Sequence, residues 1–150
     1  MDLILWRAAE AEDRSPDLER RLTAKGRRQA VHTAQWLQRR LPARFTLLAS
    51  PAVRAQQTAR TLETPLKTED GLAPGGTVRR ILEAVGWPDG KSVVVVVGHQ
   101  PDLGAVVGAL LCESAGHWSL KKGGLWWLTN RVRNEEAQVV VRAVVSPELL

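Results

Sequence analysis

The feature that most constrains the fold is the run SVVVVVG at residues 92–98, in which five consecutive valines are followed by a glycine. β-Branched side chains favour an extended backbone, and an apolar run without polar alternation is typical of a strand that is buried on both faces. Such strands occur mainly in parallel sheets that carry helices on either side. The run therefore predicts a buried strand of an α/β protein, and it is far too short to cross a bilayer.

Strand and helix signals alternate in the part of the chain before this run. Short apolar runs predict strands over residues 2–6 and 44–50. Between them, apolar residues at helical spacing predict a helix over residues 22–41, with Thr23 as its N-cap. The alternation indicates β-α-β connectivity.

The next helix is expected in SPAVRAQQTARTLE, with Ser50 as its N-cap and Pro51 at the first helical position, where the missing N–H costs nothing. Gly and Pro predict a loop over residues 66–76, and a short helix follows around TVRRILEAVG. A further helix follows the valine strand, and two strands joined by RNEEAQ close the chain as a hairpin. These elements predict a three-layer α/β/α sandwich whose mostly parallel central sheet ends in an antiparallel hairpin.

Length and cysteine content narrow the class of protein. A chain of 150 residues that is 44% hydrophobic fits one globular domain over residues 1–150. Its one cysteine, Cys112, stands at the end of an apolar helix pattern, where we expect it in the core. Because one cysteine suits a reducing compartment, and the N-terminus lacks an export signal, we expect a cytoplasmic protein and no membrane partner.

Positive charge is concentrated between Arg20 and Arg40, and Lys and Arg outnumber Asp and Glu by 21 to 16. This excess suits anionic partners, which include phosphate esters, phosphoproteins and nucleic acids. We interpret most of these residues as a solvated helix face. No RNP-like, zinc-finger or helix-turn-helix signature accompanies them, so we expect no nucleic-acid partner.

Three candidate site residues follow three predicted parallel strands. Arg7 ends the first strand, Arg54 lies one helical turn beyond the second, and His99 follows the third. Ligands of such sheets bind at the carboxyl ends of the strands, so we expect these side chains to converge. Two guanidinium groups favour a phosphate dianion over a carboxylate, and a helix that begins at Pro51 would add free N–H groups. His99 could donate a hydrogen bond or act as an acid or base.

The remaining histidines and the tryptophans carry weaker signals. His32 is expected to be partly exposed in the middle of a helix, and His117 is a loop residue that could line the pocket. Three histidines so far apart, without a cysteine pair, indicate no metal site, and nothing points to a cofactor. We expect the six tryptophans to be packing residues.

The segments LILWRA, LTAKG, SPAVRAQQTA and VVVVVGHQPDLG, in this order, resemble the histidine phosphatase superfamily. The chain is most similar to its small branch, the SixA-type phosphohistidine phosphatases, because it lacks the large insertions of phosphoglycerate mutases. The resemblance covers essentially the whole chain and implies a phosphoglycerate mutase-like fold. It also implies that Arg7 and Arg54 clamp a phosphoryl group, and that His99 contacts this group and helps to stabilise its transfer.

The chain departs from the family at Ala8, because the family has a nucleophilic histidine at this position. In an intact member this imidazole would attack phosphorus in line, and water would then hydrolyse the phosphohistidine enzyme. A methyl group cannot accept a phosphoryl group, so we expect the chain to bind phosphate with little or no turnover. Larger relatives add a carboxylic acid for the leaving group, and Glu12, Asp13 and Asp70 are candidates for it by position only.

Two interpretations of Ala8 stay open at this point. In the first, an active phosphohistidine phosphatase has been altered at its nucleophile, for example to hold an uncleaved ligand. In the second, the chain is a natural pseudophosphatase that binds a phosphorylated partner, such as a histidine phosphotransfer domain. A phosphatase for small phosphate esters or phosphoanhydrides would also satisfy two arginines and a helix terminus.

Overall fold

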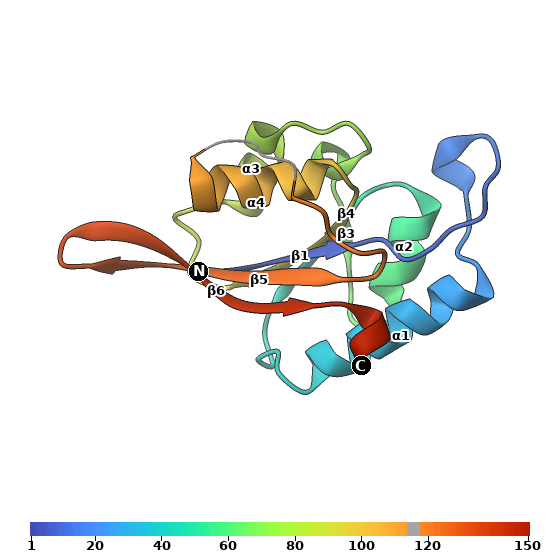
Figure 1. The fold of residues 1–150 in the computed structure, drawn as a ribbon, viewed down its shortest axis with the longest axis horizontal. Helices are drawn as coiled ribbons and strands as arrows, with labels where there is room; N and C mark the ends of the chain where they lie inside the picture. The colour runs from blue at the N-terminus through green and yellow to red at the C-terminus, as the bar shows by residue number, and fades with distance from the viewer. Residues whose placement is uncertain (114–117) are drawn as a thin grey trace.

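The structure is a computed structural model that describes residues 1–113 and 118–150. Its strands belong to one six-stranded sheet with the order β3-β2-β4-β1-β5-β6, and helices cover both faces (Figure 1). The elements in chain order are β1 (Asp2–Arg7), η1 (Asp17–Glu19), α1 (Ala24–Gln38), β2 (Thr46–Ala49), α2 (Val53–Arg60), β3 (Lys67–Thr68), η2 (Asp70–Leu72), α3 (Val78–Val85), β4 (Val93–Gly98), α4 (Asp102–Cys112), β5 (Leu125–Arg133), β6 (Glu136–Val145) and η3 (Pro147–Leu149).

The sheet combines a parallel part with an antiparallel edge. Strand β4, the valine run, lies between β2 and β1 and pairs with both in parallel, and β3 extends the parallel part beyond β2. Strand β5 pairs antiparallel with β1, and β6 pairs antiparallel with β5. Residues Val95, Val96 and Val97 are fully buried, which confirms the strand predicted to be buried on both faces. The predicted mixed α/β fold with a C-terminal hairpin is also confirmed.

Alternating side chains of β1 supply the two halves of the core. Ile4 and Trp6 pack in the cluster that holds the buried residues of α1 and α2. Leu3 and Leu5 pack in the cluster that holds those of α3 and α4. Figure 1 shows the same arrangement, with α3 and α4 together on one side of the sheet and α1 on the other. Because both faces are covered, the strand ends form the exposed edge that is free to hold a site.

The start of α1 is packed tightly against the segment that follows β1. Thr23 caps the helix as expected, because its side chain accepts a hydrogen bond of 3.0 Å from the N–H of Gly26. A Cβ atom on Gly26 would lie only 1.9 Å from the carbonyl oxygen of Glu10. Only glycine allows this approach, which brings the basic helix next to the end of β1.

The start of α2 differs from the expectation. The helix begins at Val53 with Ala52 as its N-cap, so the prediction of Ser50 as N-cap and Pro51 as first helical residue was wrong. The Ser50 hydroxyl instead bonds to the His99 ring at 2.7 Å, and it also accepts a hydrogen bond of 3.1 Å from the Ala52 N–H. The Ser50 side chain, which was expected to cap the helix, therefore forms a buried hydrogen bond with His99 at the end of another strand.

Two further expectations about the chain need correction. The predicted loop over residues 66–76 contains the short strand β3 and the turn η2. Cys112 is exposed rather than buried, because the buried residues of α4 extend only from Asp102 to Gly108 and Cys112 lies beyond them. Within the described ranges, none of the helices combines the length and apolar character needed to span a membrane.

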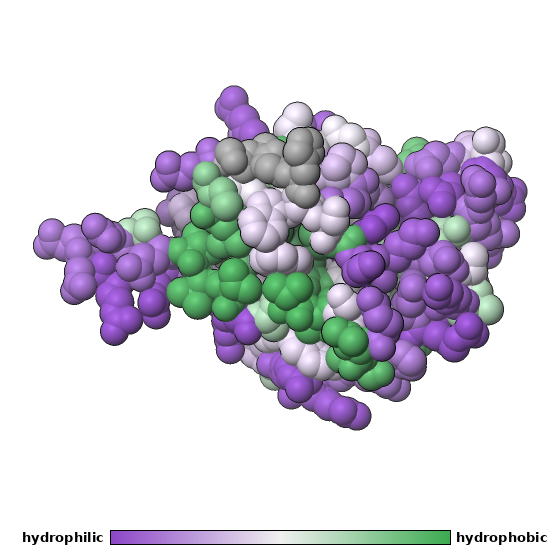
Figure 2. Space-filling view, viewed as in Figure 1, coloured by the Kyte–Doolittle hydropathy of each residue, from purple (hydrophilic) through white to green (hydrophobic). Residues whose placement is uncertain are grey.

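Tryptophans pack in both halves of the core, as expected. Trp6 and Trp127 are buried, and the Trp127 ring meets Trp36 edge to face at 6.1 Å between centroids. Trp118 is the most exposed tryptophan, at 39%, and its ring packs edge to face against that of Trp126. Figure 2 shows apolar side chains along β6, whereas the side of the molecule that carries α1 and the segment before it is largely hydrophilic.

Candidate functional site

The ends of β1 and β4 lie side by side and open a small cavity. Arg7 is paired with Gly98 in the sheet, and the N–H of the next residue, Ala8, donates to the Gly98 carbonyl at 2.9 Å. His99 follows Gly98 directly. The cavity has a volume of about 130 Å³, and its lining residues are Arg7, Ala8, Ala9, Ala11, Arg20, Arg54, Gly98, His99, Gln100 and Lys122. The structure thus brings Arg7, Arg54 and His99 together from three separate segments.

Arg7 is oriented by the loop before β5. Its Nη1 donates to the Leu120 carbonyl oxygen at 2.6 Å, and its backbone carbonyl accepts from the Gly123 N–H at 3.1 Å. Burial, together with the positive charge of Arg54, lowers the pKa of Arg7. Guanidinium nevertheless stays protonated at neutral pH, so an anion that enters the cavity relieves the repulsion between the two arginines.

Arg54 projects from the first turn of α2 and is 9% exposed. Its Nη1 donates to the Asp17 carbonyl oxygen at 2.9 Å, and its Nη2 pairs with the Asp17 carboxylate at 3.2 Å. The same carboxylate also pairs with Arg20 at 3.1 Å. Asp17 therefore links two cavity arginines and holds part of the hydrogen-bonding capacity that a phosphate would use.

His99 is 6% exposed and is held by Ser50. Burial and the nearby charge of Arg54 lower the pKa of His99 to about 4, so the ring is neutral at pH 7. The Ser50 hydroxyl and Nε2 of His99 share a hydrogen bond of 2.7 Å, and the tautomer of the neutral ring decides which of the two donates. At neutral pH His99 thus lines the cavity with an uncharged ring that adds no positive charge to those of the arginines.

Ala8 is 5% exposed and lines the cavity next to both Arg7 and His99. Its backbone N–H is already used within the sheet, and its methyl group has no lone pair with which to attack phosphorus. The cationic side chains of the cavity can therefore attract an oxyanion, but position 8 supplies no nucleophile.

Sequence reasoning missed two cationic side chains of this cavity, Arg20 and Lys122. Both lie outside the helices and long strands, so the rule of strand ends does not reach them. Arg20 was interpreted as part of a solvated basic face. The position of Arg20 depends on how the segment around η1 packs against α2. Local sequence patterns do not predict this packing.

The three candidate carboxylic acids and His32 do not line the cavity. None of Glu12, Asp13 and Asp70 lines it, so none is positioned there as an acid for the leaving group. His32 is exposed on α1, as expected. His117 belongs to residues 114–117 and lies outside the described residues. Within residues 1–113 and 118–150, no cluster of three or more His, Cys, Asp or Glu side chains could hold a metal ion.

Comparisons with known proteins agree on one family. The model of the histidine phosphatase superfamily (branch 1) matches residues 3–74. An uncharacterized protein from Picosynechococcus is 38% identical over an alignment of 139 residues, and the match covers 83% of this chain and 82% of the relative. A phosphohistidine phosphatase SixA homolog from Haemophilus influenzae is 30% identical over an alignment of 126 residues, and the match covers 73% of this chain and 77% of the relative.

Solved structures share the fold over nearly the full length. A structure assigned as phosphohistidine phosphatase SixA from Nakamurella multipartitia superposes with a TM-score of 0.80 at 28% identity, and it covers 97% of this chain and 95% of that one. The protein histidine phosphatase SixA complexed with tungstate also gives a TM-score of 0.80, at 24% identity, with 99% of each chain covered.

Proposed function

The chain belongs to the histidine phosphatase superfamily, and from this membership we propose that it binds the phosphoryl group of a phosphohistidine protein in the cavity between Arg7, Arg54 and His99. The observation that carries the proposal is the convergence of these three side chains from separate strand ends on one small polar cavity. The similarity to a SixA homolog supports the substrate class. The tungstate complex of a structural neighbour supports an oxyanion, because tungstate and phosphate are both tetrahedral.

The roles of the cavity residues follow from their charge. Arg7 and Arg54 would each direct a planar guanidinium at phosphoryl oxygens, and two such groups favour a dianion. His99 would donate from its neutral ring to a third oxygen, with Ser50 as the positioning residue that holds the ring. Arg54 is paired with Asp17, so the incoming phosphoryl group would either share Arg54 with the Asp17 carboxylate or displace that carboxylate.

Ala8 separates binding from turnover in this proposal. The cavity holds the groups that would stabilise the charge of a transferring phosphoryl group. A histidine at position 8 would have to attack phosphorus and carry the phosphoryl group until water removed it. With a methyl group there, the chain would bind the phosphoryl group and leave its bond to the substrate intact.

A second candidate function is a phosphoprotein-binding module without catalysis. The observation that favours it is Ala8 itself, which stands in a cavity whose other binding groups are present. Both candidates predict binding of a phosphohistidine protein. They differ in what happens when the nucleophile is supplied.

The experiment is the substitution Ala8→His, with Ala8→Asn as a control of similar bulk that cannot be phosphorylated. If the chain derives from a phosphatase, Ala8→His hydrolyses a phosphohistidine peptide and passes through a transient phosphoenzyme, whereas Ala8→Asn does neither. Folded Ala8→His protein without any hydrolysis would reject the phosphatase and leave the binding module. If neither the original chain nor the variants bind the peptide, both functions are rejected.

A further inference from the structure

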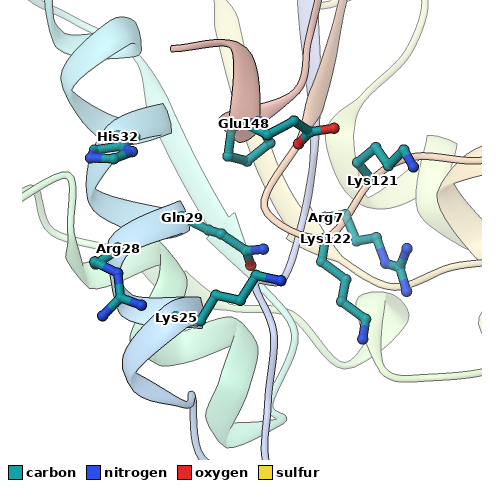
Figure 3. A pocket seen from close by; sticks show the side chains of 9 residues that line it. Arg7, Lys25, Arg28, Gln29, His32, Lys121, Lys122 and Glu148 are labelled. Atoms are coloured by element: carbon teal, nitrogen blue, oxygen red, sulfur yellow. The ribbon is translucent and has the colours of Figure 1, made fainter.

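A second, larger depression lies beside the phosphoryl cavity. We call it the basic groove. It has a volume of about 640 Å³, and its lining residues are Arg7, Lys25, Arg28, Gln29, His32, Lys121, Lys122, Pro147 and Glu148. Figure 3 shows the α1 side chains on one side of it and Arg7, Lys121 and Lys122 on the other, with Glu148 near the C-terminal end of the chain.

The groove and the cavity are adjacent. Arg7 and Lys122 line both of them, so these two side chains lie at the boundary between the cavity and the groove. The cavity, at about 130 Å³, has room for a phosphoryl group but not for the body of a substrate. A substrate that inserts its phosphoryl group there can therefore place neighbouring parts over the groove.

The groove carries an excess of positive charge. Its five Lys and Arg side chains face one carboxylate, that of Glu148. In the part of the chain that the structure describes, the ion pairs join other residues, and Lys25, Arg28, Lys121 and Lys122 take part in none of them. Unpaired cations gathered in one depression attract anionic groups and raise the rate at which an anionic partner associates.

The backbone on both sides of the groove is fixed in place. On the loop side, the Gly123 carbonyl accepts from the Thr33 hydroxyl of α1 at 2.7 Å and from the Trp6 indole at 3.0 Å. On the helix side, the side chain of Gln29 accepts from the Glu10 N–H at 3.0 Å. The charged groups thus sit on a rigid frame, while their long side chains remain free to adapt to a partner.

The residues of the groove favour a protein over a nucleic acid as the anionic partner. Single-stranded nucleic acids bind by stacking successive bases on several aromatic side chains, whereas His32 is the one aromatic ring among the described residues that line the groove. Glu148 would repel a uniformly anionic backbone, whereas a protein surface can place a cation or a neutral group opposite it.

Resting on the proposed function, we infer that the basic groove selects phosphohistidine proteins that carry carboxylates next to the phosphohistidine. The phosphoryl group would enter the cavity, and Glu or Asp side chains of the same partner would pair with Lys25 and Arg28 on one wall and Lys121 on the other. The groove would therefore determine specificity among phosphoproteins, while the cavity recognises the phosphoryl group that all of them share.

The test uses the chain as it exists, with Ala8, and measures binding of fluorescent peptides by anisotropy. The peptides contain a stable phosphohistidine analogue flanked either by glutamates or by glutamines, and each is also made without the phosphoryl group. At ~20 mM salt we expect the phosphorylated peptide with glutamates to bind about tenfold more tightly than the phosphorylated peptide with glutamines. At ~300 mM salt this difference in affinity should be largely lost, because salt screens the charges. The double variant Lys25→Glu/Arg28→Glu should lose this preference, as should Lys121→Glu.

Arg27→Glu is the matched control, because Arg27 is an exposed neighbour on the same helix that does not line the groove. It should keep most of the preference for glutamate. Equal affinity for the two phosphorylated peptides, or a preference that survives in the groove variants, would overturn the inference. So would a single-stranded DNA that binds the groove more tightly than the glutamate peptide.

The two proposals fail in different ways. If affinity depends on phosphorylation but not on the flanking charge, the inference fails and the proposed function stands. If affinity depends on the flanking charge but not on phosphorylation, the proposed function fails, and with it the assignment of the groove to phosphohistidine proteins.

Discussion

Acid should destabilise the folded chain through His99. Burial and the charge of Arg54 lower the pKa of His99 to about 4, against an ordinary value of 6.5. Between these pH values the unfolded chain binds a proton that the folded chain does not, so the free energy of unfolding falls as the pH falls. The contribution is fully present above pH 6.5 and is lost on the way down to pH 4. At about 1.4 kcal/mol for each pKa unit, the loss amounts to about 3 kcal/mol.

The assay is urea unfolding, followed by tryptophan fluorescence at several pH values from about 7.5 down to about 4. His99→Gln serves as the reference, because glutamine can bond to Ser50 but does not titrate, and all other groups contribute equally to both proteins. The gap between the two proteins should change by about 3 kcal/mol across the window, with the original chain losing more. A gap that stays constant within about 0.5 kcal/mol would refute a buried, neutral His99.

Three further substitutions test the site and the fold. Arg54→Ala should weaken phosphate binding about 10- to 100-fold in calorimetry, because a buried charged donor is lost. Arg60→Ala, at the exposed end of the same helix, should leave phosphate binding unchanged, and similar losses in both variants would contradict the assignment of Arg54 to the phosphate site. Asp17→Asn should tighten phosphate binding about two- to fivefold, because it releases Arg54, and weaker binding would show that Asp17 supports the site instead. Gly26→Ala should lower the free energy of unfolding by about 2–4 kcal/mol, because its Cβ would collide with the Glu10 carbonyl, and an unchanged urea midpoint would contradict that contact.

Much of the fold could be predicted because its strands are simple to recognise. The valine run and the apolar run of β1 have no competing helical interpretation, and they became neighbouring parallel strands. The predicted N-cap of α2 was wrong because a contact between residues far apart in the sequence outweighed the local preference. Ser50 looked like an N-cap but bonds to His99, a residue 49 positions away that local patterns cannot bring into view.

Only the residues of the candidate site that follow the ends of the strands could be predicted from the sequence. Arg7, Arg54 and His99 follow directly from the rule that parallel strands share one edge. Arg20 and Lys122 reach the same cavity from irregular segments, and their placement depends on tertiary packing. The exposure of Cys112 was missed for a related reason, because helical spacing does not tell how far a helix extends beyond the sheet it covers.

The most direct test of the account is a crystal structure of the chain soaked with tungstate. The account predicts anomalous density in the cavity, with tungstate oxygens within hydrogen-bonding distance of the guanidinium groups of Arg7 and Arg54 and of the His99 ring, next to the Ala8 methyl group. Tungstate bound only in the basic groove, or a cavity that stays empty while Arg54 remains paired with Asp17, would contradict it.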